Sequence, residues 1–347
     1  MDRDNRRVDL DLVFLGTSGS APTASRAPAA LLVRRGGDRL LFDCAEGTQR
    51  QLMRSTVGLP DLEEIFITHY HGDHYLGLPG MLKTFQLRQR EVPLTVYGPP
   101  GLRDLFSGLR RVFGKLSYDL DLVEVRPGEA LERDGYQILV FPVDHGTSAV
   151  GYALDEHDRP GRFDNDAADA LGIPFGPERG ALQHGESVTL DDGRVFTPDA
   201  VIGEPRPGRR IVIPGDTAPV DTVRVLAEGA DVLVHEATFT EEERDRAADT
   251  SHSTALQAAE IARDAGVRLL ALTHVSPRYF GNELAREAQD VFAATVVPRD
   301  FDVIEVPFAE RGEPHRTRQR VRRPGRSGGP RPDQRERDPH RLHDRQR

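Results

Sequence analysis

Short apolar runs alternate with longer amphipathic segments over residues 10–306, and this alternation is typical of an α/β protein. The apolar runs predict strands at residues 11–15, 30–34, 39–42, 65–67, 94–97, 121–125, 138–143, 210–214, 232–235, 269–273 and 302–306. Segments with helical spacing predict helices at residues 46–54, 74–90, 102–113, 219–228, 254–265 and 284–294. The elements form one group up to residue 143 and another from residue 210. This division predicts two sheets packed face to face with helices outside.

Two segments depart from the alternating pattern. Residues 156–208 are rich in Gly, Pro and Asp and contain few apolar runs. A segment of this length inside a compact domain is usually functional or disordered. Residues 311–347 contain almost no apolar side chains, so we expect this tail to be disordered. The sequence therefore predicts one domain over 1–310, with an insertion at about 156–208, followed by a basic tail.

Charge is distributed unevenly along the chain. The tail holds 13 arginines and 5 acidic residues, so residues 1–310 carry about −18 against −10 for the whole chain. Lys83 and Lys115 are the only lysines, which fits either adaptation to high salt or a high genomic GC content. An acidic body is unfavourable for binding nucleic acid, because contacts to phosphate normally need positive charge. A local pair of metal ions can still hold phosphate whatever the global charge.

The sequence also indicates a cellular compartment. Cys44 is the single cysteine, which excludes a disulfide framework and fits a reducing cytoplasm. Because it directly follows the apolar run at 40–42, we expect it to be a small core residue. No apolar run approaches the roughly 18 residues of a membrane span, and the first residues lack the apolar part of a signal peptide. We therefore expect a cytoplasmic protein without a membrane partner.

Residues 68–74 carry the densest group of potential metal ligands. His69, His71, Asp73 and His74 follow directly after the apolar run at 65–67. Imidazole and carboxylate together suit zinc, iron or manganese. Spacing this tight cannot bring all four to one ion without strain. It can divide them, with His69 and His71 on one ion and the other two on a second.

Other apolar runs end in the same way. Four of them lead directly to Asp144-His145, Asp216, His235-Glu236 and His274. Open α/β sheets place their ligands at the carboxyl ends of strands. We therefore expect the strands to converge on one polar, metal-binding edge. Seven histidines lie at such positions, namely His69, His71, His74, His145, His235, His252 and His274.

The signature from His69 to His74 resembles that of the metallo-β-lactamase superfamily. Further motifs resemble the tRNase Z family of tRNA 3′-processing endoribonucleases over residues 8–308. These motifs are Phe141 to His145 with Gly151-Tyr152, Pro214 to Thr217, His235 to Thr238, Ser251 to Thr254 and Thr273 to Tyr279. The resemblance implies an αββα sandwich that usually forms a homodimer. It also implies that residues 156–208 are a projecting arm that grips tRNA.

By this resemblance, the chain is a zinc-dependent endoribonuclease that removes 3′ trailers from precursor tRNA and leaves a 3′-hydroxyl on the tRNA. Two Zn²⁺ ions are implied for each chain, in keeping with the suitability of two metals for phosphodiester hydrolysis. The implied ligands are His69, His71 and His145 for one ion, Asp73, His74 and His274 for the other, and Asp216 as a bridge between them.

The same resemblance assigns roles to residues beside the metals. Asp73 would also hold the proton of the attacking water, and His252, oriented by Glu236, would protonate the leaving oxygen. The alternative for Glu236 and His252 is structural support of the ligands. His235 is open between support of the sheet and support of a ligand.

Four residues are expected to contact the RNA, namely Arg278, Tyr279, Arg162 and Arg179. Packing is the alternative for Tyr279. The chain departs from the family in its arm, which has Arg179 where lysines are usual, and in its early loop, which has Arg26-Ala27 in place of Arg-Asn. Two other functions remain open, a generic metal-dependent phosphodiesterase and a non-catalytic RNA-binding protein. The arm argues against the first, and the complete ligand set argues against the second.

Overall fold

A computed structural model describes residues 9–59 and 62–319 of the chain. Within this part, one sheet has eight strands in the order β17-β16-β1-β2-β3-β4-β5-β6. Its strands are β1 Leu10–Gly16, β2 Ala30–Arg35, β3 Asp38–Phe42, β4 Glu64–Phe66, β5 Leu94–Gly98, β6 Leu120–Glu124, β16 Asp302–Glu305 and β17 His315–Arg318. The second sheet has seven strands in the order β15-β14-β13-β12-β9-β8-β7. They are β7 Ala130–Arg133, β8 Tyr136–Pro142, β9 Val150–Glu156, β12 Arg210–Gly215, β13 Val232–Glu236, β14 Leu269–Thr273 and β15 Thr295–Val296.

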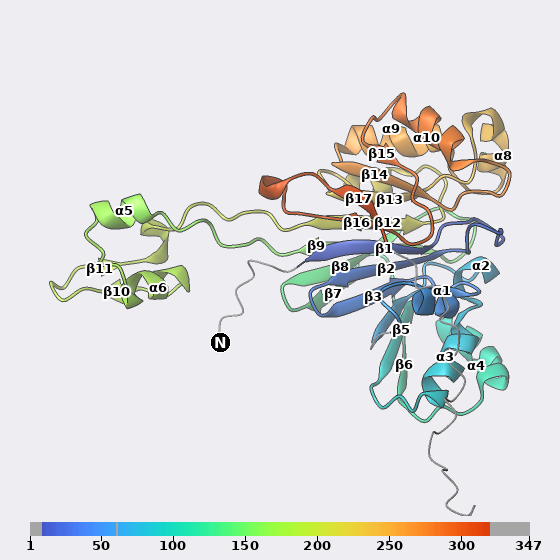
Figure 1. Cartoon of the computed structure of the whole chain (residues 1–347), viewed down its shortest axis with the longest axis horizontal. Helices are drawn as coiled ribbons and strands as arrows, with labels where there is room; N and C mark the ends of the chain where they lie inside the picture. Colours follow the sequence, from blue (N-terminus) through green and yellow to red (C-terminus); the bar gives the residue numbers. More distant parts are fainter. Residues whose placement is uncertain (1–8, 60–61, 320–347) are drawn as a thin grey trace, which may run out of the picture.

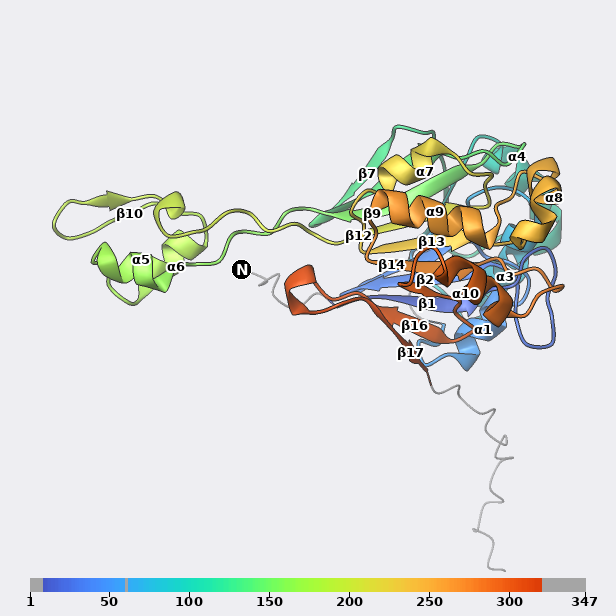
Figure 2. The same ribbon diagram turned by 90° about the horizontal axis from the view of Figure 1, so that it is seen from above.

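Helices cover the outer face of each sheet, as Figures 1 and 2 show. Those outside the first sheet are α1 Thr48–Arg54, α2 Gly72–Tyr75, α3 Leu78–Leu87 and α4 Leu102–Phe113. Those outside the second sheet are α7 Asp221–Leu226, α8 Arg244–Asp249, α9 Ala255–Ala265 and α10 Gly281–Gln289. Three apolar clusters fill the space between the sheets and beneath each helical layer. The predicted αββα sandwich is confirmed.

Several details differ from the sequence prediction. The strand expected at 138–143 belongs to the second sheet, where β8 pairs with β9, and the strand expected at 302–306 belongs to the first, where β16 pairs with β1. Apolar alternation locates a strand but does not name its partner. The single helix expected over 74–90 is divided into α2 and α3. The division falls at Gly77, where a Cβ atom would lie 2.0 Å from the carbonyl oxygen of Ala45.

The tail begins later than expected. Residues 315–318 form β17, which pairs antiparallel with β16, so the expectation of disorder from residue 311 is wrong for this stretch. The side chains of β17 are mostly exposed, and backbone hydrogen bonds to the neighbouring strand hold it in place. A strand stabilised in this way leaves little apolar signal in the sequence. The rest of the expected tail, residues 320–347, lies outside the described residues.

The insertion between β9 and β12 projects from the sandwich as an arm with a small folded head (Figures 1 and 2). The head contains α5 Asn165–Ala170, α6 Pro177–Gln183, β10 Val188–Thr189 and β11 Val195–Phe196. Its own apolar cluster includes Ala168, Ile173 and Leu182. The head is therefore a miniature core, although its apolar residues are too scattered to form recognisable runs in the sequence.

The base of the arm is fixed to the sandwich by charged and aromatic contacts. The two arm segments pair at Arg159 and Arg206 through two backbone hydrogen bonds of 2.7 and 2.8 Å. The guanidinium of Arg159 stacks on the ring of Phe308 at 3.5 Å, and that of Arg209 stacks on the same ring at 4.1 Å. Glu310 accepts hydrogen bonds from Arg159 and Arg206. The segment after β16 therefore holds both arm segments where they leave the second sheet.

The environment of Cys44 agrees with the sequence prediction. Cys44 is fully buried and reduced, and burial raises the pKa of its thiol, as expected for a core residue that is not a nucleophile.

Among the helices of the described residues, none has the length and apolar character needed to cross a membrane.

Candidate active site

Polar residues from many parts of the chain gather at one edge of the sandwich. His69, His71, Asp73 and His74 follow β4 and continue into α2. The loops after β8, β12 and β14 contribute His145, Asp216 and His274, and the segment before α9 contributes His252. The convergence predicted from the strand ends is therefore present in the structure.

Asp216 occupies the centre of this cluster. Its Oδ2 atom lies 3.1 Å from Nε2 of His274 and 3.3 Å from Nε2 of His74. The same oxygen lies 3.9 Å from Nε2 of His145 and 4.0 Å from Nε2 of His69. Two groups of ligand atoms flank it, and within each group the atoms lie within 4.8 Å of one another. One group is His69, His71 and His145, and the other is Asp73, His74 and His274.

On the β4 side, Asp43 and Thr68 orient two of the imidazoles. Nδ1 of His74 lies 2.7 Å from Asp43 and donates to its carboxylate. The hydroxyl of Thr68 donates to the same carboxylate, so its oxygen is left to accept from Nδ1 of His69, 3.1 Å away. Both imidazoles therefore carry a proton on Nδ1 and turn Nε2 toward Asp216.

On the β13 side, Thr238 and the backbone orient the other two imidazoles. Nδ1 of His145 donates to the carbonyl oxygen of Ser251 at 2.9 Å. The hydroxyl of Thr238 donates to Glu236 at 2.5 Å, so its oxygen accepts from Nδ1 of His274 at 2.8 Å. In both cases the second ring nitrogen, Nε2, points its lone pair into the cluster.

The inward-facing nitrogen and oxygen atoms of this cluster are suited to binding a cation. Nε2 of His69 and Nε2 of His74 are buried and make no hydrogen bond within the described part of the chain. Nε2 of His145 and Nδ1 of His71 approach each other to 3.0 Å. Buried lone pairs without donors are costly, and a shared metal ion removes that cost. Imidazole and carboxylate ligands in this mixture suit zinc or a similar transition metal.

The electrostatics of the cluster favour the same conclusion. Burial strongly disfavours the charged form of His69 and lowers its pKa, which leaves it neutral as a ligand must be. For His74 burial acts in the same direction, but the charges of Asp216 and Asp43 outweigh it and raise the pKa of the imidazole. Burial raises the pKa of the Asp216 carboxyl, but the neighbouring His274 and His74 outweigh this effect and lower the pKa. Positive charge is therefore favoured beside Asp216, where it would counter the buried carboxylates.

A loop from the first sheet closes one side of the cluster. The backbone N–H of Ser20 donates to Oδ2 of Asp73 at 2.8 Å. Gly19 lies directly against His274, since a Cβ atom there would come within 2.7 Å of its Nδ1. Glycine is thus required at this position, and the loop after β1 is part of the site.

His252 and Glu236 form an acid–base pair against the cluster, and both also lie in groups of atoms that could hold a metal, with His145 and Asp216 or with His274. Nδ1 of His252 donates to Oε1 of Glu236 at 2.8 Å, which leaves Nε2 available to a substrate. Burial opposes the charged imidazole, but the negative charge of Glu236 outweighs it and raises the pKa of His252 to about 9. A protonated imidazole held in this way is a proton donor at neutral pH.

Comparisons with known proteins agree with the geometry. The chain matches the family model of the metallo-β-lactamase superfamily over residues 26–161. It is 48% identical to ribonuclease Z of Haloferax volcanii over 310 residues, which cover 87% of this chain and 97% of the relative. It is 42% identical to ribonuclease Z of Methanosarcina acetivorans, over 86% of this chain and 99% of the relative. The chain belongs to the ribonuclease Z family. The crystal structure of human tRNase Z, short form, is also similar, with a TM-score of 0.63 and 27% identity over 86% of this chain and 99% of the human one.

In this ribonuclease Z family member, the seven residues predicted as metal ligands all join the cluster, whereas His235 does not. His235 is fully buried in β13, and its Nδ1 donates to the carbonyl oxygen of Glu236 at 2.8 Å. Among the described residues it belongs to none of the groups that could hold a metal. Of the two roles left open for His235, its position favours support of the sheet.

The four residues expected to contact RNA lie in two places. Arg278 and Tyr279 follow the cluster by a few residues, and Arg278 lies at the surface, 3.6 Å from Glu243. Arg162 is exposed near the start of the arm. Arg179 lies in the head, where it donates to the carbonyl oxygen of Ile173 and pairs with Asp169. The guanidinium of Arg179 therefore holds the head together, and a contact with RNA stays a prediction for all four.

Several orienting residues were missed in the sequence. Asp43 directly follows the apolar run at 40–42, so the same strand-end pattern that located the histidines could have located it. Thr68 and Thr238 stand beside predicted site residues, but a threonine carries no metal signal of its own. Ser251 acts through its backbone carbonyl, for which the side chain offers no signal.

Proposed function

We propose that this chain is an endoribonuclease that cleaves precursor tRNA on the 3′ side and removes the trailer. The observation that carries the proposal is the identity of 42–48% to ribonuclease Z from several organisms over 86–88% of the chain. The complete cluster around Asp216 supports an active enzyme. The projecting arm favours a large substrate over the small molecules of a generic phosphodiesterase.

We propose that the cluster holds two Zn²⁺ ions. His69, His71 and His145 would bind one ion, Asp73, His74 and His274 would bind the other, and Asp216 would bridge them. Metal ions bound there would polarise the scissile phosphate and lower the pKa of a water molecule toward about 7. The inward lone pairs and the central carboxylate support this assignment.

Two proton transfers in the reaction would be carried out by side chains of this chain. The carboxylate of Asp73 would accept the proton of the attacking water. Attack breaks the bond between phosphorus and the ribose O3′ of the tRNA, so the phosphate stays on the trailer. His252, held by Glu236, would give its Nε2 proton to the departing O3′ and leave a 3′-hydroxyl on the tRNA.

We propose that the arm binds the tRNA away from the reacting phosphate. Arg162 near the start of the arm and the ring of Phe175 in the head, which is 91% accessible, are available to phosphate and bases. Residues 160–203 contain three arginines and eight acidic residues, so the arm offers little positive charge. Arg278 and Tyr279 would contact RNA near the cleavage site.

We also propose that two copies of the chain associate. Met53 on α1 is 39% exposed, and Leu87 on the adjacent α3 is 80% exposed. Val112 on α4, which packs against α3, is 69% exposed. A second copy of the chain would cover these apolar side chains, and light scattering would detect the dimer as a doubled mass.

A cytoplasmic location is proposed on the buried, reduced Cys44.

The direct test is incubation of purified protein with a 5′-labelled precursor tRNA carrying a 3′ trailer, with and without chelator. We expect a single cut that yields tRNA with a 3′-hydroxyl and a free trailer, and we expect chelator to abolish it. The His71→Ala variant should lose bound metal and cleavage together. Intact precursor after incubation with metal-loaded enzyme would contradict the proposed function.

A further inference from the structure

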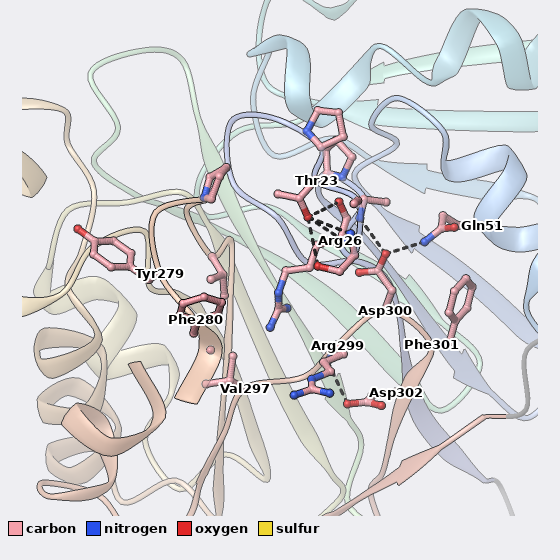
Figure 3. A pocket seen from close by; sticks show the side chains of 18 of the residues that line it. Thr23, Arg26, Gln51, Tyr279, Phe280, Val297, Arg299, Asp300, Phe301 and Asp302 are labelled. Carbon is pink, nitrogen blue, oxygen red and sulfur yellow. Dashed lines mark hydrogen bonds between the residues drawn. The ribbon is translucent and has the colours of Figure 1, made fainter. Parts of the chain in front are cut away.

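A large groove opens beside the cluster, between the edge strands of the two sheets. It has a volume of ≈ 1390 Å³ and is lined by residues of β15, β17, α1, the loop after β1 and the segment after β14. This exceeds the roughly 300–1,000 Å³ of a typical small-molecule pocket. Figure 3 shows Tyr279 and Phe280 on one side of it and the Asp300–Gln51 contact on the other. Its size therefore favours part of a polymer over a metabolite.

Two chain segments connect the wall of the groove to the active site. Gly19 and Ser20 contact His274 and Asp73, and the same loop continues into the groove wall at residues 22–28. His274 belongs to the cluster, and residues 275–277 and 279–282 after it line the groove. The groove therefore borders the cluster on the side formed by these two segments.

Of the three acidic residues that line the groove in the described part of the chain, Asp300 and Asp302 are engaged within the protein, and Glu46 is exposed on its wall. Asp300 accepts hydrogen bonds from Thr17, the backbone of Ala27 and Gln51. Asp302 accepts from the backbone N–H of Arg299 at 2.9 Å and lies 3.8 Å from Arg316. Arg26 is also used internally, because it donates to Thr17 and to the carbonyl oxygen of Pro298. The hydrogen-bonding atoms of Asp300 and Arg26 are therefore directed largely at the protein itself.

Arg54 also lines the groove, but it donates to Gln51 and stacks on Phe301. Three other arginines contribute exposed positive charge. Arg50, Arg299 and Arg318 are exposed and line the groove from three different elements. Within the described residues, none of the three guanidinium groups is joined to a carboxylate by an ion pair. In a body whose net charge is about −18, three such cations around one groove indicate an anionic ligand.

An aromatic side chain completes the groove. Phe280 lines it and is 75% exposed, which is unusual for a large apolar ring. Exposed aromatic rings together with a basic groove are the combination that binds single-stranded nucleic acid, by stacking bases and neutralising phosphates. A folded tRNA is far too large for this space, whereas one extended strand fits.

We propose that this groove binds the 3′ trailer of the precursor, with Arg50, Arg299 and Arg318 on its phosphates and Phe280 stacked on a base. The proposal rests on the proposed endoribonuclease function. The groove contributes nothing when only one trailer nucleotide is present and contributes progressively more as the trailer grows. Recognition depends on single-stranded RNA and not on a particular base.

The test compares precursors that carry the same tRNA with a trailer of one nucleotide or of about ten. The triple variant Arg50→Ala, Arg299→Ala, Arg318→Ala should raise KM for the long trailer and leave kcat and the short trailer nearly unchanged. Loss of three phosphate contacts on a single strand should reduce the slope of log KM against log salt by about 2. Phe280→Ala should weaken binding of the long trailer by roughly 5- to 150-fold.

Arg126→Ala is the matched control, because this exposed arginine lies between β6 and β7 at the opposite edge of both sheets. If the triple variant kept the wild-type KM for both trailers, the proposal that the groove binds the trailer would be refuted. The endoribonuclease function would remain in place. An equal loss on both trailers would also refute the proposal for the groove, because the groove would then serve the tRNA body or the fold. Absence of cleavage by the wild-type enzyme would instead refute the proposed function itself.

Discussion

Nδ1 of His252 lies 2.8 Å from Oε1 of Glu236, and the two side chains are 12% and 1% exposed. The two groups of ligands around Asp216 are complete without either residue, and both also lie within reach of other ligand atoms of the cluster. We expect the pair to serve proton transfer and not metal binding. His252→Ala and Glu236→Gln should keep most of the bound metal and lose cleavage by about 10²–10⁴-fold, the usual effect of removing a general acid. Metal analysis and single-turnover cleavage on the same samples would measure both quantities.

The exposed His157→Ala is a matched control, because His157 lies far along the chain from most of the ligands and pairs with the exposed Glu132 at 3.4 Å. It should keep wild-type metal content and activity. If His252→Ala lost its metal along with its activity, His252 would be a ligand or the support of one, and another group would have to supply the proton.

Asp43 provides a test of how the ligands are oriented. It holds Nδ1 of His74 at 2.7 Å, and Asp43→Asn would remove the charge that keeps Nε2 turned inward as an acceptor. We expect metal affinity to fall by about 10–100-fold, the usual effect of losing such a partner. Competition with a chromogenic chelator would measure it, and the exposed Asp121→Asn on β6 is the control. Unchanged affinity in Asp43→Asn would mean that the ligand geometry does not depend on this contact.

The arm is expected to serve binding and not the chemical step. Arg159 and Arg206 already pair through their backbones, so residues 160–203 can be replaced by a short Gly-Ser bridge without moving the base. Hydrolysis of a small chromogenic phosphodiester should persist in the deletion, and precursor-tRNA cleavage should fall sharply through a higher KM. Because the arm carries few cations, salt should change its contribution only slightly. Normal processing of tRNA by the deletion would reduce the arm to a passive insertion.

Glu156 predicts a pH-dependent stability. Its buried carboxylate accepts hydrogen bonds from Arg35 and Arg209, each at 2.7 Å. Burial disfavours the charged carboxylate, but the two arginines outweigh it and lower its pKa from 4.5. Glu156→Gln should therefore reduce the free energy of unfolding near pH 7 by about 3–5 kcal/mol, since it leaves two buried cations with less compensation.

The pH dependence follows from the sign of that shift. A lowered pKa contributes stability that is present above the unfolded value of 4.5 and is lost as the pH falls through the folded value. The difference between wild type and variant should shrink below about pH 4.5 in urea unfolding experiments. The exposed Glu129→Gln should behave like wild type throughout. A difference that stayed constant down to pH 3 would show that the charge of Glu156 is not what stabilises the fold.

The parts of the site that could be predicted are those in which ligands follow apolar runs. His69 to His74, His145, Asp216 and His274 all carry this local signal, and each lies in the cluster. Asp43 carries the same signal, because it directly follows the apolar run at 40–42, but it was not predicted. The groove could not be predicted, because Arg50, Arg299 and Arg318 meet only through the pairing of β17 with β16 and the position of α1.

The fold was predictable to a similar depth. Apolar runs located most of the strands, but the sheet to which β8 and β16 belong depends on long-range pairing that no local pattern encodes. The head of the arm was unexpected because its core contains few residues, among them Ile173 and Leu182, which are separated by polar stretches. β17 was missed for a related reason, since it is held by backbone hydrogen bonds and buries little apolar surface.

The most direct measurement is a metal titration of the chelator-treated enzyme during single-turnover cleavage of precursor tRNA. We expect no cleavage without metal, a rise as zinc is added, and a plateau near two ions per chain, with a 3′-hydroxyl on the tRNA product. Asp216→Asn should stay inactive at every zinc concentration, because the central carboxylate that faces both groups of ligands is gone. Full cleavage by the metal-free enzyme, or by Asp216→Asn, would contradict a metal-dependent endoribonuclease centred on this residue.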